Sequence, residues 1–104
     1  MLKSWGLFIS LLFLPNLLFS QKSKLDVPVN VEYDNRSLEK ILVNLEDKTG
    51  ILLSYNPESV PLSHWISYSA INKPVSMVLS EILNPLDLEY QVVAKQVIIR
   101  PKKN

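Results

Sequence analysis

Apolar and polar residues alternate between Val27 and Tyr33, and this pattern predicts a β-strand. Apolar side chains stand at every second position, with proline or polar residues between them. A period of two places the apolar side chains on one face of a strand. Asp34 and Asn35 follow, and we expect these turn-forming residues to end the strand.

The next segment has the spacing of an amphipathic helix. Its apolar residues lie three and four positions apart, at Leu38, Ile41, Leu42 and Leu45. Ser37 is the expected N-cap, because its hydroxyl can accept a hydrogen bond from a free N–H of the first turn. Gly50 is the expected end of the helix, since glycine enters the left-handed region without a Cβ penalty. The carboxylates of this segment are expected on the solvent side, at Glu39, Glu46 and Asp47.

The same pattern returns 37 positions later, which indicates a duplicated unit. A strand from Ile51 to Tyr55 closes the first half, and a strand from Trp65 to Ser69 opens the second. Pro74 is expected in the first turn of the second helix, where its missing N–H costs nothing. The apolar stripe of that helix is Val75, Val78, Leu79 and Ile82. Asn84-Pro85 is expected to end it.

Two further strands are predicted at residues 88–92 and 97–99. The turn between them, near Ala94 and Lys95, lacks the Asn-Gly sequence typical of a tight hairpin. Each helix has one apolar stripe and each strand one apolar face, and two helices between two small sheets would bury them all. We therefore predict an α+β fold of two βαβ-like repeats, in the order β-α-β-β-α-β-β.

Residues 1–20 have the layout of a secretory signal peptide. Lys3 is their only charged residue, an apolar run follows, and polar residues begin after Ser20. A retained membrane anchor is the alternative, but the uncharged stretch is at the short limit for a span and contains Pro15. We expect cleavage near Ser20, a domain at residues 25–101 and a basic tail at 102–104.

Composition excludes several classes of protein. After residue 20 the chain carries equal numbers of basic and acidic residues, which argues against nucleic-acid binding. It has no cysteine, so disulfides and thiolate metal sites are impossible. Its two glycines cannot build a phosphate-binding loop. The pattern thus favours a small exported domain without a cofactor.

The segments VNVEYDNRSLEKILVNLEDKTGILLSYNPESV and ISYSAINKPVSMVLSEILNPLDLEYQVVAKQVIIRPKK carry a family resemblance. Together they resemble an STN domain, the short N-terminal domain of secretins and TonB-dependent outer-membrane receptors. The matching features are the alternating strand, Asn-x-Ser-Leu at the helix start, Thr-Gly, and a strand ending in Asn-Pro. The style of the leader and second half is similar to receptors of the Bacteroidetes type. Pro74 and Met77 depart from the usual pattern of the second helix.

The resemblance implies a non-enzymatic interaction and signalling module in the periplasm or at the outer membrane. Its partner would be an anti-sigma regulator or a receptor or secretin component. The chain ends at Asn104, before any plug, barrel or secretin repeat, so a truncated remnant of a larger receptor is an alternative. A small secreted enzyme is a further alternative and would require a cleft of converging polar groups.

The residues themselves indicate no catalytic, cofactor or metal site. His64 is the single histidine, and a metal or catalytic role would need partner ligands. The basic tail could touch anionic lipid only weakly. Binding through exposed strand edges needs no special side chain, and it is the mode we expect. The candidate contact residues lie at strand ends and in the connection between halves: Tyr55, Asn56, Pro57, His64 and Trp65.

Overall fold

The computed structural model describes residues 23–103, in two helices, five strands and two short 3₁₀ turns. In chain order the elements are η1 (Lys24–Asp26), β2 (Pro28–Ser37), α2 (Leu38–Thr49), β3 (Leu52–Tyr55), β4 (Trp65–Pro74), α3 (Val75–Leu83), η2 (Asn84–Leu86), β5 (Leu88–Val93) and β6 (Gln96–Pro101). The predicted order of strands and helices is confirmed. The expected signal peptide lies outside the described residues.

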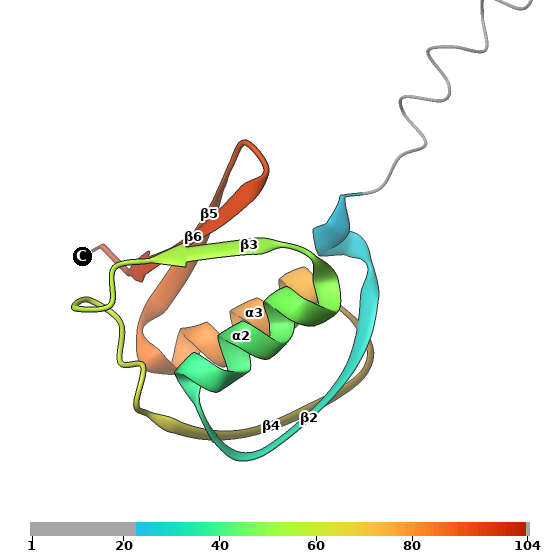
Figure 1. The fold of residues 1–104 in the computed structure, drawn as a ribbon, viewed down its shortest axis with the longest axis horizontal. Helices are drawn as coiled ribbons and strands as arrows, with labels where there is room; N and C mark the ends of the chain where they lie inside the picture. The colour runs from blue at the N-terminus through green and yellow to red at the C-terminus, as the bar shows by residue number, and fades with distance from the viewer. Residues whose placement is uncertain (1–22, 104) are drawn as a thin grey trace, which may run out of the picture.

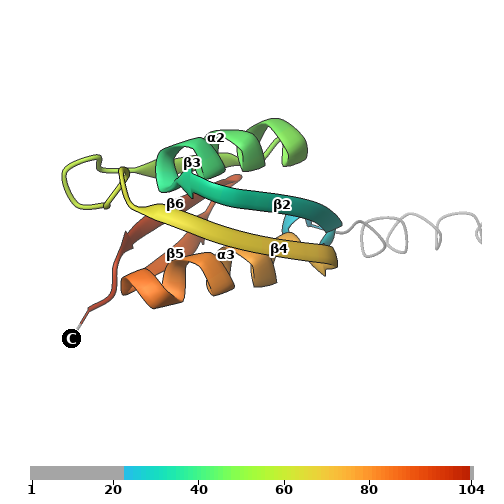
Figure 2. The same cartoon turned by 90° about the horizontal axis from the view of Figure 1, so that it is seen from below.

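The two helices lie between two small sheets, as predicted (Figures 1 and 2). One sheet is the antiparallel pair β2–β4, and the other has the order β3-β6-β5. Strand β6 runs parallel to β3 and antiparallel to β5. Each strand–helix–strand half therefore begins in one sheet and ends in the other, and β6 separates the last strands of the two halves.

The 37-residue repeat is present in the backbone. Asn35 and Asn72 both have a positive φ, of 54° and 53°, and each lies at a register shift of the β2–β4 pair. The Asn35 N–H donates to Ser67 Oγ (2.9 Å), and the Asn72 N–H donates to Asn30 Oδ1 (2.6 Å). The two donors are one repeat length apart in the sequence, and so are the two acceptors. The two halves are thus related by an approximate two-fold axis.

The predicted ends of β2 and β4, the strands that open the two halves, are wrong. Both strands continue past the predicted breaks, β2 to Ser37 and β4 to Pro74. Asn35 in β2 and Asn72 in β4 each take the left-handed conformation as the extra residue of a β-bulge. Each strand therefore bends without leaving the sheet. Pro74 then stands just before α3 rather than inside its first turn.

Helix α2 begins and ends at the predicted capping residues, Ser37 and Gly50. Ser37 Oγ accepts the Lys40 N–H at 3.3 Å, and Gly50 takes the left-handed conformation at the other end. Helix α3 has no side-chain cap, because Pro74 occupies the N-cap position. It ends at Leu83, and Pro85 continues into the turn η2, as the Asn-Pro pair predicts.

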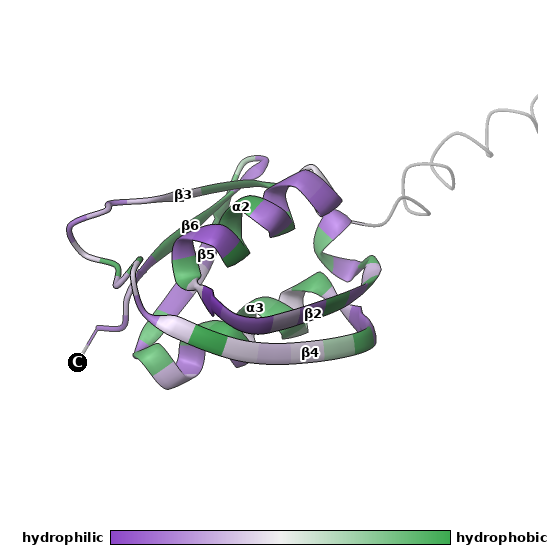
Figure 3. Ribbon diagram, turned by 60° about the horizontal axis from the view of Figure 1, so that its bottom comes forward, coloured by the Kyte–Doolittle hydropathy of each residue, from purple (hydrophilic) through white to green (hydrophobic). Residues whose placement is uncertain are grey.

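The core lies between the sheets and is made mainly by the helix stripes. All eight predicted stripe positions are buried, and hydrophobic and hydrophilic stretches alternate around both helix ribbons (Figure 3). Both sheets contribute buried residues to the same cluster. The buried hydrophobic residues are Val31, Tyr33, Leu38, Ile41, Leu42, Leu45, Ile51, Leu53, Val60, Ala70, Val75, Val78, Leu79, Ile82, Leu83, Leu88, Val97 and Ile99.

Candidate functional site

The connection between the two halves, residues 56–64, is held in place by its backbone. The Leu38 N–H donates to the His64 carbonyl (2.9 Å), and the Glu39 N–H donates to the Leu62 carbonyl (3.0 Å). Two N–H groups of the first turn of α2, which have no partner inside the helix, are satisfied in this way. Val60, in the middle of the connection, is buried in the core. The connection therefore presents its outer side chains from a fixed backbone.

Three of the predicted contact residues have local structural roles. Tyr55 is half-buried against the core, and burial, followed by the charges of Glu39 and Glu46, raises its pKa. Asn56 closes a turn, because its side-chain oxygen accepts the Glu58 N–H at 3.0 Å. Pro57 is exposed within that turn. These residues shape the connection, and none of them projects a large apolar surface.

Trp65 is different, because it is the first residue of β4 and 64% of its surface is exposed. It pairs with Ser37, the last residue of β2 and the N-cap of α2. Shallow hollows flank it, one of about 240 Å³ toward α3 and one of about 410 Å³ toward the start of α2. The side chain of His64 is exposed beside it and borders the first hollow. His64 and Trp65 are thus brought together at the surface.

A hydrogen-bonded group of polar side chains forms one wall of the hollow toward α3. Tyr68 Oη donates to Glu81 Oε1 (2.6 Å), and Lys73 Nζ donates to the same oxygen (2.8 Å). These bonds from Lys73 and Tyr68 hold the pKa of the Glu81 carboxyl below its usual range. Burial and the Glu81 carboxylate raise the pKa of Tyr68. The Glu81 carboxylate therefore stays ionised near neutral pH, and Tyr68 keeps its proton.

The hollow toward α2 is bordered by charges of both signs. Arg36 and Lys40 lie there with Glu39. Neither cation makes a salt bridge within residues 23–103. Their side chains are therefore available to a partner that docks against Trp65.

The free edge of β3 is partly closed by a side chain that we expected in solvent. Glu46 Oε2 accepts the Leu53 N–H at 2.8 Å, so the expectation of a fully solvated helix face is wrong at this position. The reason is tertiary, because β3 returns alongside the C-terminal half of α2. Glu39 and Asp47 are exposed, as expected.

The free edge of β5 has no such cover. The Lys102 N–H donates to the Asp87 carbonyl (3.0 Å), which fixes the alternation of the antiparallel β5–β6 ladder. The N–H groups of Leu88, Tyr90 and Val92 consequently face away from β6. No hydrogen bond joins these three groups to another part of the described chain. The position equivalent to Glu46 is Leu83, which is buried and cannot accept a hydrogen bond.

Residues 23–103 contain no cluster of three His, Cys, Asp or Glu side chains that could hold a metal ion. Over the same residues, none of the helices has the length and apolar character needed to cross a membrane. The arrangement offers an exposed tryptophan between two hollows and an open strand edge, which are features of a docking surface.

Comparison with known proteins adds no relative. No family model matches the chain, and no curated protein matches it.

Proposed function

We propose that this protein is a non-enzymatic interaction module of the STN type that acts in the periplasm and binds a partner protein. The single observation that carries this proposal is the exposure of Trp65 on a fixed backbone between two hollows. A tryptophan so placed exposes a large apolar surface to water, and burial against a partner would remove it. Tryptophan is also enriched among residues that dominate binding energy at protein interfaces.

The open edge of β5 supports the same proposal. An extended partner segment could bind the outward N–H and carbonyl groups of Leu88, Tyr90 and Val92 by strand addition. The edge of β3 is a poorer acceptor of a strand, because Glu46 already occupies the Leu53 N–H. We infer that a partner strand is added at β5.

By the resemblance, the partner is the periplasmic part of an anti-sigma regulator or a component of an outer-membrane receptor or secretin. We would test any anti-sigma regulator and any outer-membrane transporter found encoded beside the gene, with the full chain in a Trp5→Phe background. Trp65 is then the only tryptophan and reports its own burial. Binding should move its fluorescence to shorter wavelength, and Trp65→Ala should weaken binding at least about tenfold.

Ile71→Ala is the matched control, since Ile71 is 84% exposed on the same strand but borders neither hollow. Its affinity should stay within about twofold of the parent. Hydrogen exchange supplies the second measurement, because the amides of Tyr90 and Val92 should exchange rapidly in the free protein and slowly in the complex. Equal affinity of the Trp65→Ala variant and the parent, or absence of binding to both candidates, would reject the proposal.

A further inference from the structure

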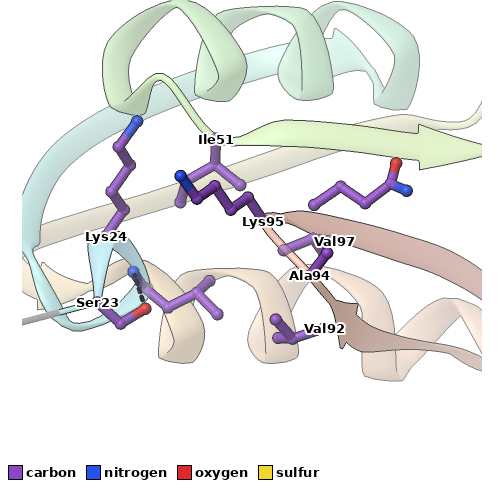
Figure 4. Close-up of a pocket in the computed structure, with 9 residues that line it drawn as sticks. Ser23, Lys24, Ile51, Val92, Ala94, Lys95 and Val97 are labelled. Atoms are coloured by element: carbon purple, nitrogen blue, oxygen red, sulfur yellow. Dashed lines mark hydrogen bonds between the residues drawn. The ribbon is translucent and has the colours of Figure 1, made fainter.

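A third hollow, a groove, lies far from Trp65, between η1 and the hairpin of β5 and β6. It has a volume of about 450 Å³ and is bordered by side chains from η1, the start of β3 and the hairpin (Figure 4). The turn η1 lies next to the start of β2, whereas Trp65 pairs with Ser37, the last residue of β2. At about 3.3 Å per residue, the ten residues of β2 place the two sites at opposite ends of the domain. The groove shares no lining residue with either hollow beside Trp65.

The floor of this groove is the apolar core itself. Ile51 and Val97 border it and are 6% and 2% exposed. Leu25 contributes from η1, and Val92, which is 51% exposed, contributes from the hairpin. An apolar ligand placed here would cover the exposed part of Val92 and continue the packing of the core.

Two lysines border the apolar floor, and no acidic residue lines the groove. Lys24 Nζ donates to the Gly50 carbonyl at 3.2 Å, which leaves further N–H bonds of the ammonium group free. Lys95 makes no salt bridge within the described residues. Figure 4 shows the side chains of Lys24 and Lys95 reaching from opposite sides toward Ile51. The uncompensated positive charge at this mouth favours an anion.

The turn that presents Lys95 has an unfavourable backbone. Ala94 has a φ of 58°, a conformation that favours glycine, asparagine or aspartate. The hairpin register, which pairs Val93 with Gln96, fixes this two-residue turn at the groove. Lys95 is therefore held beside the apolar floor by the ladder on both sides of the turn.

We propose that this groove binds a small amphiphilic anion, an apolar chain or ring that carries one carboxylate. The volume is in the range of small-molecule sites, which are mostly apolar with a few fixed polar groups. The apolar part would lie on Ile51, Val92 and Val97, and the carboxylate would bind Lys24 and Lys95. This site is separate from the docking surface around Trp65, so either proposal can fail without the other.

Octanoate is a suitable probe, with octan-1-ol as a neutral probe of the same chain length. We expect octanoate titrated into the ¹⁵N-labelled full chain to shift the amide signals of Ile51, Val92 and Val97. It should bind at least tenfold more tightly than octan-1-ol. Lys95→Gln should weaken octanoate binding at least fivefold and leave the affinity for octan-1-ol within twofold of the parent. Lys95→Arg should retain most of the affinity for octanoate.

Lys102→Gln is the matched control, since it removes the same charge outside the groove and should leave octanoate affinity within twofold. Val92→Asp places a carboxylate on a half-exposed side chain at the rim and should abolish octanoate binding while the protein stays folded. Equal binding of octanoate and octan-1-ol, equal effects of the Lys95 and Lys102 variants, or shifts confined to other residues would overturn the proposal. So would preferential binding of the acidic peptide acetyl-Glu-Leu-Asp-Leu-amide at the same residues.

Discussion

The first half of the domain, from β2 to β3, and the second, from β4 to β5, follow the same path with different side chains. Helix α2 has a serine N-cap, an acidic residue in its first turn and a glycine at its C-cap. Helix α3 has proline before it, no acidic residue in its first turn, and Asp87 at the position equivalent to Gly50. Local signals that define α2 are thus weak in α3, although both helices form. Packing of the apolar stripe is what the two halves share.

The same comparison separates the two strand edges. The carboxylate of Glu46 covers the edge of β3, while Leu83 at the equivalent position packs into the core and leaves the edge of β5 open. One half is therefore closed at its edge and the other is accessible to an added strand. The two halves share one backbone frame, and single positions such as Glu46 and Leu83 make them unequal.

The largest effect is expected in the core that the halves share. Leu42 and Leu79 are equivalent stripe residues, 1% and 0% exposed. Leu42→Ala and Leu79→Ala should each lower the free energy of unfolding by roughly 2–5 kcal/mol, measured by urea titration. Both variants should unfold in one transition. A two-step transition in either variant would show that the halves are separate folding units and would contradict a single core.

An intermediate effect is expected at the two equivalent left-handed positions. Gly50→Ala should destabilise the protein by about 1–2 kcal/mol, because φ is 73° there and alanine resists this region. Asp87→Gly should instead stabilise it by about 0.5 kcal/mol, since φ is 61° and glycine removes the strain. Thermal unfolding of both variants checks the pair. A stabilising Gly50→Ala would show that the C-cap of α2 tolerates a side chain.

The smallest effect is expected at Asn44 and Glu81, the equivalent helix residues whose side chains each accept a hydrogen bond from a tyrosine. Tyr33 Oη donates to the neutral Asn44 (2.8 Å), whereas Tyr68 Oη donates to the ionised Glu81. Folding lowers the pKa of Glu81 below its ordinary value of 4.5, so the ionised carboxylate stabilises the fold above that pH. This stabilisation is lost as the pH falls through the lower pKa of the folded state.

Glu81→Gln should therefore reduce stability more at pH 7 than at pH 3, in urea titrations against the parent chain. Asn44→Ala is the control from the other half, and its cost should be the same at both pH values because no charge changes. A cost of Glu81→Gln that is independent of pH would show that only the shape of the side chain matters.

Much of the fold was predictable because its signals are local. The spacing of the apolar stripes located both helices. Ser37 marked the start of α2 because its hydroxyl caps the first turn, and Gly50 marked the end because glycine takes the left-handed conformation. The bulges at Asn35 and Asn72 were not predictable, because an asparagine with a positive φ occurs both in turns that end a strand and in bulges within a continuing strand. Only the partner strand decides between these outcomes.

The candidate site was only partly predictable. His64 and Trp65 were identified from their place between the halves, and the structure brings them to one exposed surface. Tyr55 packs against the core at the end of β3, and Asn56 and Pro57 lie in the turn that follows. Glu46 gave no sign of its role, since its carboxylate looks like any exposed residue of an amphipathic helix until β3 lies beside it.

The sequence by itself determined the number and order of the helices and strands, the buried stripes of both helices and the internal repeat, because periodicity and capping act over a few residues. Tertiary structure alone decided which strands share a sheet, which edge is open, and which lysines border the apolar groove near η1. These features depend on contacts between residues tens of positions apart, and such contacts leave no repeating pattern in the chain.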